Sequence, residues 1–412
     1  LNPNVVVELN PHGIFGVNRA FLSGVDHVRL LPHGSVFWSE EQNEAQVDSN
    51  GILISKIRSM KLARSLNETM FSYTGPERAN AKLHSYRLLM AESMAFNRNS
   101  LGDLGAPLDA FKWPDDLLRY VRFYHDQNQH YSATHTVADI AVLRSFPSLA
   151  YNSLDPQLQT TLMEQLLIQY KLPFNYVFDQ NLGDLSKYRV LILADQESLS
   201  DRAVQQITAF VRGGGNLVVT GRTSLYTDWR RTRKDYGLAD VLGIHAGQPA
   251  PESKQGRFGQ GRVAYVRDVV PGVSVPSWAG TGSFFPIAAS GFGHAYWKLP
   301  KNSEDLIAAI RYAEGQPFPV EFKDAPLTTV MELTEKNDGS ERILHWLNYQ
   351  LGSPVPPSSV SVAIPSGKRV QSIELISPDR SSESLQFKSA DGRVEFTLPQ
   401  MEVYNVAVIN LK

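Results

Sequence analysis

The chain has 412 residues, of which 42% are hydrophobic and 20% charged, and its formal net charge is −2. This length predicts two or three domains, because a domain usually has about 100–200 residues. The low net charge, without a long run of Lys or Arg, excludes the electrostatic pattern of a nucleic-acid-binding protein and favours a neutral ligand. No stretch approaches the roughly 18 consecutive apolar residues of a membrane span. From the charge pattern we therefore expect no nucleic-acid partner, and from the lack of an apolar span no membrane.

The sequence contains no cysteine, which excludes disulfides, thiolate metal sites and a cysteine nucleophile. This composition slightly favours a secreted or periplasmic location over a cytoplasmic one without deciding between them. His125, His130 and His135 follow one another closely, but their spacing is not that of a known zinc site. We therefore expect neither a metal nor any other cofactor.

From residue 4 to about residue 105, predicted strands alternate with predicted helices. The strands are NVVVELN (4–10), VDHVRLLP (25–32), ETMFSYTG (68–75) and NSLGDLG (99–105), and the helices are 17–24, 52–67 and 81–98. Such alternation predicts βαβ units and a parallel sheet. Four strands make half of an eight-stranded α/β barrel, so we predict that residues 1–132 form the C-terminal half of a TIM barrel. The strand directly after Leu1 fits this count, and we expect a missing N-terminal half-barrel upstream.

Residues 133–314 are predicted to form a second α/β domain. The predicted strands are VADIAVLRS (137–145), YRVLILAD (188–195) and NLVVTG (216–221). Leucines recur every fourth residue from Leu154 to Leu166 and predict a helix between the first two strands, and Ser200 caps the helix before the third. This pattern is typical of a doubly wound domain of the flavodoxin or amidotransferase type. Residues 213–215 are all glycine, but they follow a helix and precede a strand, which predicts helix termination and no phosphate site.

The hydrophobic period changes to two from about residue 317. Residues 359–364 and 394–398 alternate apolar and polar side chains, and Asp338-Gly339 and Asp391-Gly392 are predicted hairpin turns. Residues 315–412 are therefore predicted to form a small antiparallel β-sandwich.

Several stretches carry a resemblance to a known family. GVDHVRLLPHGSVFWSEE (24–41) takes the place of a sixth barrel strand, and LLMAESMAFNRNSLGDLG (88–105) that of the last barrel helix and strand. VADIAVLRS opens the middle domain, and RILHWLNYQ, SPDRSSESL and VEFTLPQMEVYNVAVINL lie in the tail. In this order they resemble the rear part of the glycoside hydrolase family 42 β-galactosidases and their uncharacterised barrel relatives. The resemblance implies a half-barrel, an amidotransferase-like trimerisation domain and a C-terminal β domain.

The same resemblance implies where catalysis takes place. In that family the acid/base glutamate ends the fourth strand, which would lie upstream of Leu1, and the nucleophile is a glutamate that ends the seventh. Here ETMFSYTG ends in Tyr73-Thr74-Gly75, without a carboxylate, so a retaining mechanism is not implied. The middle domain forms a subunit interface in the family, which implies a homo-oligomer.

Barrel active sites lie at the C-terminal ends of the strands, and glycoside hydrolysis needs two carboxyl groups. We predict Glu41 as a catalytic carboxylate and Glu40 as the second choice, because adjacent side chains usually point in opposite directions. A solvated loop or an arginine partner is the alternative for both. The candidate substrate-binding residues are Glu8, Asn10, His33, Trp38, Tyr73 and Asp103.

Three of these candidates also have a structural interpretation. Trp38 would stack on a sugar or be buried under a loop; His33, like His12, would bind a hydroxyl or serve packing; and Asp103 would lie on the barrel rim or form a turn.

The sequence thus predicts a glycoside hydrolase, acting on O-glycosyl bonds of a β-galactoside-like or related carbohydrate substrate at the barrel mouth. Two alternatives stay open: a barrel that binds carbohydrate without cleaving it, and a fragment that mainly serves assembly or oligomerisation. A carboxyl pair with displaced pKa values would favour the enzyme, whereas aromatic side chains without such a pair would favour the binding barrel.

Overall fold

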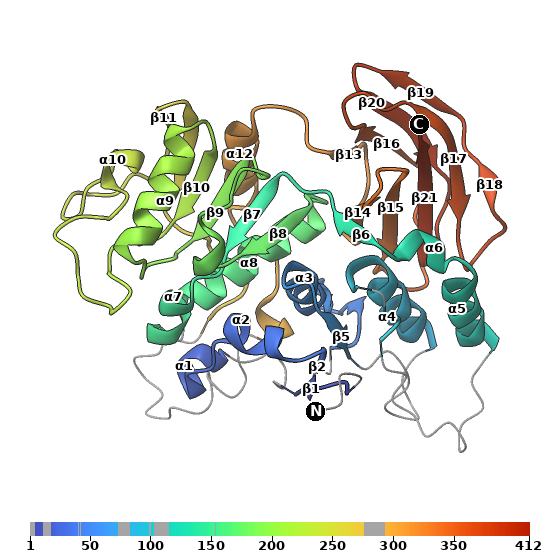
Figure 1. Ribbon diagram of the computed structural model, residues 1–412, viewed down its shortest axis with the longest axis horizontal. Coiled ribbons are helices and arrows are strands. Elements are labelled where there is room, and N and C mark those ends of the chain that lie inside the picture. Colours follow the sequence, from blue (N-terminus) through green and yellow to red (C-terminus); the bar gives the residue numbers. More distant parts are fainter. Residues whose placement is uncertain are drawn as a thin grey trace.

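The computed structural model describes residues 5–10, 18–39, 41, 43–72, 83–98, 100–102, 115–152, 154–275 and 293–412, and in residues 83–85 the backbone only. Figure 1 shows three groups of elements: N-terminal helices and short strands in blue, a mainly parallel sheet in green, and antiparallel sheets in red. The N-terminal elements lie below the other two groups in this view and contact both. None of the described helices is long and apolar enough to cross a membrane.

The N-terminal segment contains a sheet of three parallel strands in the order β1-β2-β5. These strands are β1 (Glu8–Leu9), β2 (Val36–Trp38) and β5 (Thr69–Phe71). Each strand of this sheet pairs in parallel with the strand of the same sheet that follows it in the chain, as strands of an α/β barrel do. The helices of this segment are α1 (Arg19–Ser23), α2 (His27–Leu30), α3 (Ile57–Ser65), α4 (Leu83–Phe96), α5 (Asp115–Asp126) and α6 (Asn128–Tyr131).

The strand predicted at residues 25–32 is wrong. Asp26 caps helix α2 there, because its side chain accepts hydrogen bonds from the backbone N–H groups of Val28 and Arg29. The short 3-10 helix η1 (Leu31–His33) follows, with Pro32 in its first turn. The strand comes later, as β2, in residues predicted to be a loop. The apolar residues of 25–32 therefore lie largely in helical turns. A short apolar run in the sequence fits a helix as well as a strand, so the pattern alone did not distinguish the two.

The other predictions for this segment hold in part. The strand at 68–75 and the helix at 81–98 are confirmed as β5 and α4, but the helix at 52–67 begins only at residue 57. Before it, β4 (Leu53–Ile54) pairs with β3 (Gln46–Val47). In the predicted strand 99–105, residues 100–102 are not in a strand, and the rest lies outside the described residues. The described part of this segment thus has three parallel strands where four were expected.

The middle sheet has the order β11-β12-β10-β9-β7-β8, in which β11 is antiparallel to its neighbour and the other strands are parallel. Without β11, the sequence order of the strands is 2-1-3-4-5, which is the order of flavodoxin-like folds. The strands are β7 (Ile140–Leu143), β8 (Phe174–Val177), β9 (Val190–Ala194), β10 (Asn216–Thr220), β11 (Ser253–Phe258) and β12 (Gly261–Val266).

Helices cover both faces of this sheet. Val190 and Ile192 belong to one hydrophobic cluster with α8 (Asp155–Gln169) and α12 (Ser303–Glu314). Leu191 and Leu193 belong to another cluster, with α9 (Asp201–Arg212) and α10 (Ala239–Leu242). Helix α9 ends at the glycine run, as predicted, with Gly213 at the cap and Gly214 at φ +109°. The described residues of this part also form helix α7 (Phe146–Tyr151) and the short 3-10 turns η2 (Asp179–Asn181) and η4 (His294–Tyr296).

The C-terminal part consists of two antiparallel sheets, in the orders β13-β16-β20-β19 and β18-β17-β21-β15-β14-β6. Their facing side chains form one core, in which Val360 and Phe396 of one sheet meet Leu344 and Trp346 of the other. The strands are β6 (Thr134–Thr136), β13 (Val320–Phe322), β14 (Thr329–Lys336), β15 (Glu341–Asn348), β16 (Ser358–Ala363), β17 (Val370–Ile376), β18 (Glu383–Ser384), β19 (Phe387–Ala390), β20 (Arg393–Leu398) and β21 (Tyr404–Leu411). Strand β6 lies far from the other strands of this part in the sequence, and it pairs with β14 at the edge of the sheet.

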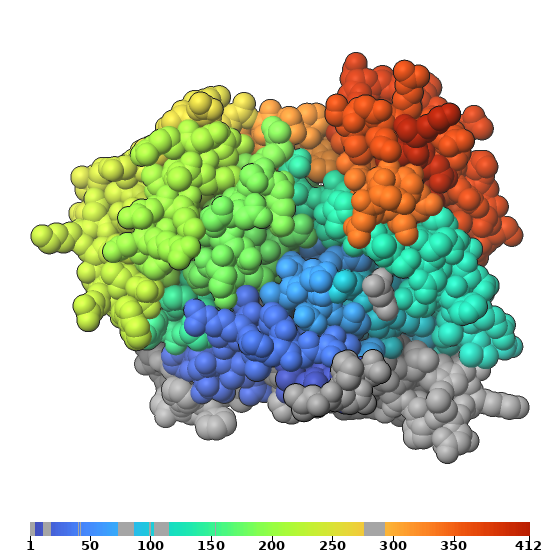
Figure 2. Space-filling view, viewed as in Figure 1, coloured from blue at the N-terminus to red at the C-terminus, as the bar shows by residue number. Residues whose placement is uncertain are grey.

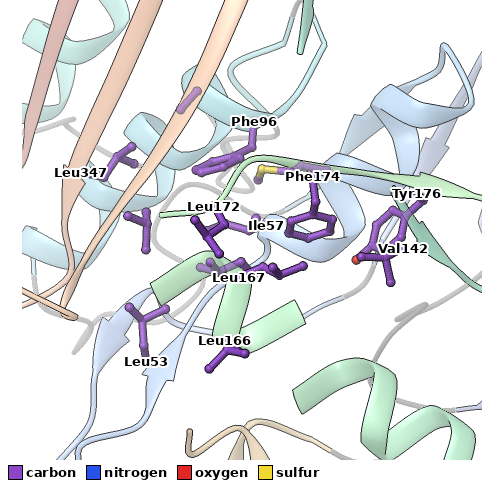
Figure 3. Close-up of a cluster of buried hydrophobic side chains, with 14 of the residues drawn as sticks. Leu53, Ile57, Phe96, Val142, Leu166, Leu167, Leu172, Phe174, Tyr176 and Leu347 are labelled. Atoms are coloured by element: carbon purple, nitrogen blue, oxygen red, sulfur yellow. The ribbon is translucent and has the colours of Figure 1, made fainter. Parts of the chain in front are cut away.

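Helix α3 lies where all three parts meet. Figure 3 shows Ile57 of α3 and Phe96 of α4 packed near Leu167 and Phe174 of the middle part, with Leu347 of the C-terminal part nearby. These residues belong to one hydrophobic cluster. The N-terminal, middle and C-terminal parts therefore share a core, and α3 is buried along its whole first two turns.

Candidate functional site

The three parallel strands of the N-terminal sheet end at one edge, where a barrel enzyme places its chemistry. Glu8 in β1 and Asn10 just after it are both exposed. Trp38, the last residue of β2, is half-buried. His33 is exposed in η1 and precedes β2, so it does not follow a strand end as was expected. The chain after Trp38 leads to the predicted catalytic glutamate.

Glu41 is buried, with 5% of its surface exposed. Its carboxylate accepts a hydrogen bond from the Ser39 hydroxyl at 2.9 Å and another from the Ser59 hydroxyl of α3. Burial raises the pKa of Glu41, while these two hydrogen bonds and the charges of Lys56 and Arg58 act in the opposite direction. The carboxyl group therefore points into the protein, against the first turn of α3, and does not face bulk solvent.

A second buried carboxyl group, Glu92 of α4, lies beside the same helix end. Its Oε1 accepts hydrogen bonds from the backbone N–H of Lys56 at 2.8 Å and from the Tyr349 hydroxyl at 2.7 Å. Burial raises the pKa of Glu92 to about 7, and the nearby charge of Glu41 raises it further. Two carboxyl groups with raised pKa values thus flank the start of α3. A group that holds its proton near neutral pH can act as a general acid.

Buried cations connect this cluster to the middle part. Arg58 of α3 donates to Glu164 of α8 at 3.1 Å and to the side chain of Gln165 at 2.5 Å. Arg144, after β7, makes two hydrogen bonds of 2.8 Å to the same Glu164. The Arg58 guanidinium also lies over the Trp297 ring, 4.3 Å from its centroid. Glu164 is therefore shared by two arginines, an arrangement that fixes α3 against α8.

The predicted site is only partly brought together in the described residues. Glu40, Tyr73 and Asp103, and with them His12, lie outside those residues. Sequence reasoning missed Glu92, whose signal is a carboxylate inside the apolar helix sequence LLMAESMAF. In the described ranges, no group of three His, Cys, Asp or Glu side chains is placed to hold a metal ion.

Comparisons with known proteins agree with this architecture. Residues 167–266 match the model of the β-galactosidase trimerisation domain. A catalytic mutant of a GH42 β-galactosidase from G. stearothermophilus shares the fold with a TM-score of 0.67 and 12% identity, over 100% of this chain and 64% of that one. The chain has the fold of the family 42 β-galactosidases. The resemblance predicted from the sequence is thereby confirmed.

Other solved structures extend the likeness. The β-galactosidase from Bacillus circulans sp. alkalophilus matches with a TM-score of 0.62 and 14% identity, over 99% of this chain and 64% of that one. The α-L-fucosidase isoenzyme 2 from Paenibacillus thiaminolyticus matches with a TM-score of 0.63 and 18% identity, over 94% and 66%. A comparison with curated proteins gives no match. The chain thus spans about two thirds of the length of the family 42 structures that it resembles.

Proposed function

We propose that this chain is part of a glycoside hydrolase that cleaves a β-galactoside-like or related carbohydrate at the mouth of an α/β barrel. The observation that carries the proposal is a fold shared over nearly the whole chain with glycosidases, including β-galactosidases and an α-L-fucosidase. In this proposal residues 1–132 form the C-terminal half of the barrel and pair with an N-terminal half. Residues 133–314, apart from strand β6, form the doubly wound domain, and residues 315–412 form the β-sandwich, to which β6 adds an edge strand.

Within this proposal, Glu41 is the candidate catalytic carboxyl group of the chain, with Glu40 as the second choice. Two observations support Glu41: it follows the C-terminal end of β2, and burial raises its pKa, as in known general acids. Glu8 in β1, Asn10 just after it and Trp38 at the end of β2 are candidates for substrate contacts. Tyr73, Asp103 and His33 complete the proposed set.

The test measures hydrolysis of a panel of nitrophenyl glycosides by the full-length protein. We expect Glu41→Gln to lower kcat by about 100-fold or more, because glutamine keeps the shape and the serine contacts but cannot transfer a proton. The exposed neighbour Glu44 supplies the matched control, and Glu44→Gln should keep the wild-type rate. If Glu41→Gln and Glu40→Gln both keep full activity, the proposed catalytic role of this stretch is refuted.

A carbohydrate-binding barrel without catalysis is the second candidate. One observation favours it: the Glu41 carboxylate accepts hydrogen bonds from the hydroxyls of two serines inside the protein, so its oxygen is already used in internal contacts. This candidate predicts saturable binding of an oligosaccharide with no product release. Calorimetric titration combined with product analysis therefore separates the two functions.

We also propose that the chain assembles into a homo-oligomer through its middle domain. The support is the match of residues 167–266 to a trimerisation domain. Trp229 lies in this range with 73% of its surface exposed, and a large exposed aromatic side chain is typical of an interface anchor. We expect a trimer by analytical ultracentrifugation, and Trp229→Ala should shift the mass distribution toward the monomer. A monomeric wild-type protein at micromolar concentration would contradict this proposal.

A further inference from the structure

A polar cavity of about 310 Å³ lies where the three parts meet. Its walls come from the C-terminal ends of α3 and α4, from β8 at the edge of the middle sheet, and from β6 at the edge of a C-terminal sheet. On the face drawn in Figure 2, the blue N-terminal surface meets the green middle surface and the teal surface of the chain before and around β6. The cavity lies at the ends of α3 and α4, away from the C-terminal ends of the barrel strands.

Positive charge dominates the lining of this cavity. The described lining contains three cationic side chains, Arg64, Arg98 and Lys187, and one carboxylate, Asp184. The hydrogen bonds recorded for the two arginines go to neutral acceptors: Arg64 donates to the Asn97 carbonyl at 2.7 Å and Arg98 to the Asn67 carbonyl. The positive charges are therefore not balanced by these contacts.

The Arg64 guanidinium also has unused hydrogen-bonding capacity. Its Nε is buried and has no partner among the described residues. Burial lowers the pKa of Arg64, and the nearby charge of Arg98 lowers it further, whereas Glu332 acts in the opposite direction. A buried donor without a partner is costly, and a bound acceptor would relieve that cost.

We propose that this cavity binds a phosphate or sulfate group, either free or carried by a monosaccharide. Guanidinium groups recognise such tetrahedral oxoanions through paired, charge-assisted hydrogen bonds. Amide and hydroxyl groups from Asn175, Asn181 and Thr134 line the same space and can bind further oxygens. A volume of about 310 Å³ is at the lower end of the range for small-molecule sites, which fits a single sugar with its anionic group.

Helix capping is the competing explanation for the two arginines. Each contacts a carbonyl just beyond the end of the other helix, and a cation at a helix C-terminus is favourable without any ligand. Capping does not use the Arg64 Nε, however, and does not explain Lys187, which is exposed beside the cavity. The two explanations therefore predict different effects of Lys187 on anion binding.

Calorimetric titration of the full-length protein tests the proposal with four probes: inorganic phosphate, inorganic sulfate, glucose 6-phosphate and glucose, at constant ionic strength. We expect at least one anion to bind with a Kd below about 1 mM and glucose not to bind. Arg98→Gln and Lys187→Gln should each weaken binding about tenfold, which corresponds to the loss of one charge-assisted hydrogen bond.

The controls separate binding from folding. Arg202→Gln changes an exposed arginine on α9, far along the chain from the cavity, and should leave the Kd unchanged. Lys187 is exposed, so its replacement tests the site even where Arg98→Gln disturbs the helix ends. Tighter binding of glucose 6-phosphate than of phosphate supports a sugar-borne anion, and the reverse supports a free one. The proposal is overturned if no anion saturates below about 10 mM, or if Lys187→Gln and Arg98→Gln leave the Kd unchanged.

Discussion

At the scale of single residues, Glu92 determines how the first turn of α3 is held. Its carboxylate accepts the backbone N–H of Lys56, at the point where a helix has free donors and a positive dipole end. The Tyr349 hydroxyl, from the C-terminal part, donates to the same oxygen. Deep burial opposes ionisation of this group, so its protonation contributes to the pH dependence of folding.

The raised pKa of Glu92 predicts the direction in which the free energy of unfolding changes with pH. The folded-state pKa of about 7 lies above the ordinary value of 4.5, so the folded protein binds the extra proton and this group's contribution to stability falls as pH rises from about 4.5 to 7. The upper limit of that loss is about 3 kcal/mol, from about 1.4 kcal/mol for each pKa unit. We expect Glu92→Gln to flatten the pH dependence of the unfolding free energy, measured by urea titration at pH 5 and pH 7.5.

The control for this experiment is Glu44→Gln, which changes an exposed carboxylate. The unfolding free energy of Glu44→Gln should depend on pH in the same way as that of the wild type. Burial also raises the pKa values of Asp195 and Glu314 to about 7. Both residues are present in both variants, so they contribute equally to the pH dependence of the unfolding free energy. An identical pH dependence in Glu92→Gln and the wild type would contradict the role assigned to Glu92.

The residue scale also shows what local sequence can predict. Alternation of side-chain direction predicted that at most one of the two adjacent glutamates faces the barrel pocket. Glu41 is buried, but Glu40 lies outside the described residues, so this stays a prediction. Glu92 was missed because its partner Tyr349 is 257 residues away in the sequence. A carboxylate in an apolar helix indicates only that a partner exists, since the docking of distant domains decides which residue it is.

At the scale of elements, helix α3 and its N-cap residue Lys56 contain several buried charged side chains. Lys56, Arg58 and Lys61 are each at most 2% exposed. Arg58 pairs with Glu164 of α8 and Lys61 with Glu332 of β14, so one helix is held by ion pairs to two different parts. A buried pair is costly to break, because the remaining charge has no partner in a low-dielectric interior.

The Lys61–Glu332 pair supplies a double-mutant test. Lys61 Nζ lies 2.8 Å from both carboxylate oxygens of Glu332, and the Thr136 hydroxyl donates to the same group at 2.6 Å. We expect Lys61→Met to cost about 3–5 kcal/mol of unfolding free energy. The double variant Lys61→Met with Glu332→Gln should cost less, because no unpaired charge stays buried.

A surface pair gives the reference for this cycle. Arg380 and Glu383 are 35% and 42% exposed and lie 2.6 Å apart, and Arg380→Met should cost less than about 1 kcal/mol. Denaturant titration measures five proteins: the wild type, Lys61→Met, Glu332→Gln, their double variant and Arg380→Met. If the free-energy costs of the two single substitutions at Lys61 and Glu332 add up to the cost of the double variant, the ion pair makes no specific contribution to stability, and its proposed role in holding α3 is refuted.

Element boundaries were predictable where the hydrophobic period was long and unambiguous. Helix α4 and the strands β16 and β20 follow their sequence patterns closely. Residues 25–32 do not, because Asp26 provides a helix cap within a short apolar run whose period fits either structure. Strand β6 was hidden for a different reason, since only its pairing with β14, about 200 residues later, makes it a strand.

At the scale of the whole molecule, the order of the parts was predictable and their joint core was not. One hydrophobic cluster contains Ile57 of α3, Phe174 of β8 and Leu347 of β15, as Figure 3 shows. Domains with small polar interfaces unfold separately, whereas a large apolar interface couples them. The described residues therefore predict that the three parts depend on each other for stability.

This coupling predicts one main unfolding transition. Leu167 of α8 is fully buried in the shared cluster, and Leu167→Ala should cost about 2–5 kcal/mol through lost burial and the cavity that remains. Because the cluster spans all three parts, the substitution should lower the hydrogen-exchange protection of β5, β9 and β21 together. Leu327→Ala, at a leucine that is 40% exposed, is the matched control and should cost less than about 1 kcal/mol. Two separate calorimetric transitions, with the β-sandwich keeping its wild-type midpoint in Leu167→Ala, would show instead that the shared cluster packs the parts together without making their folding cooperative.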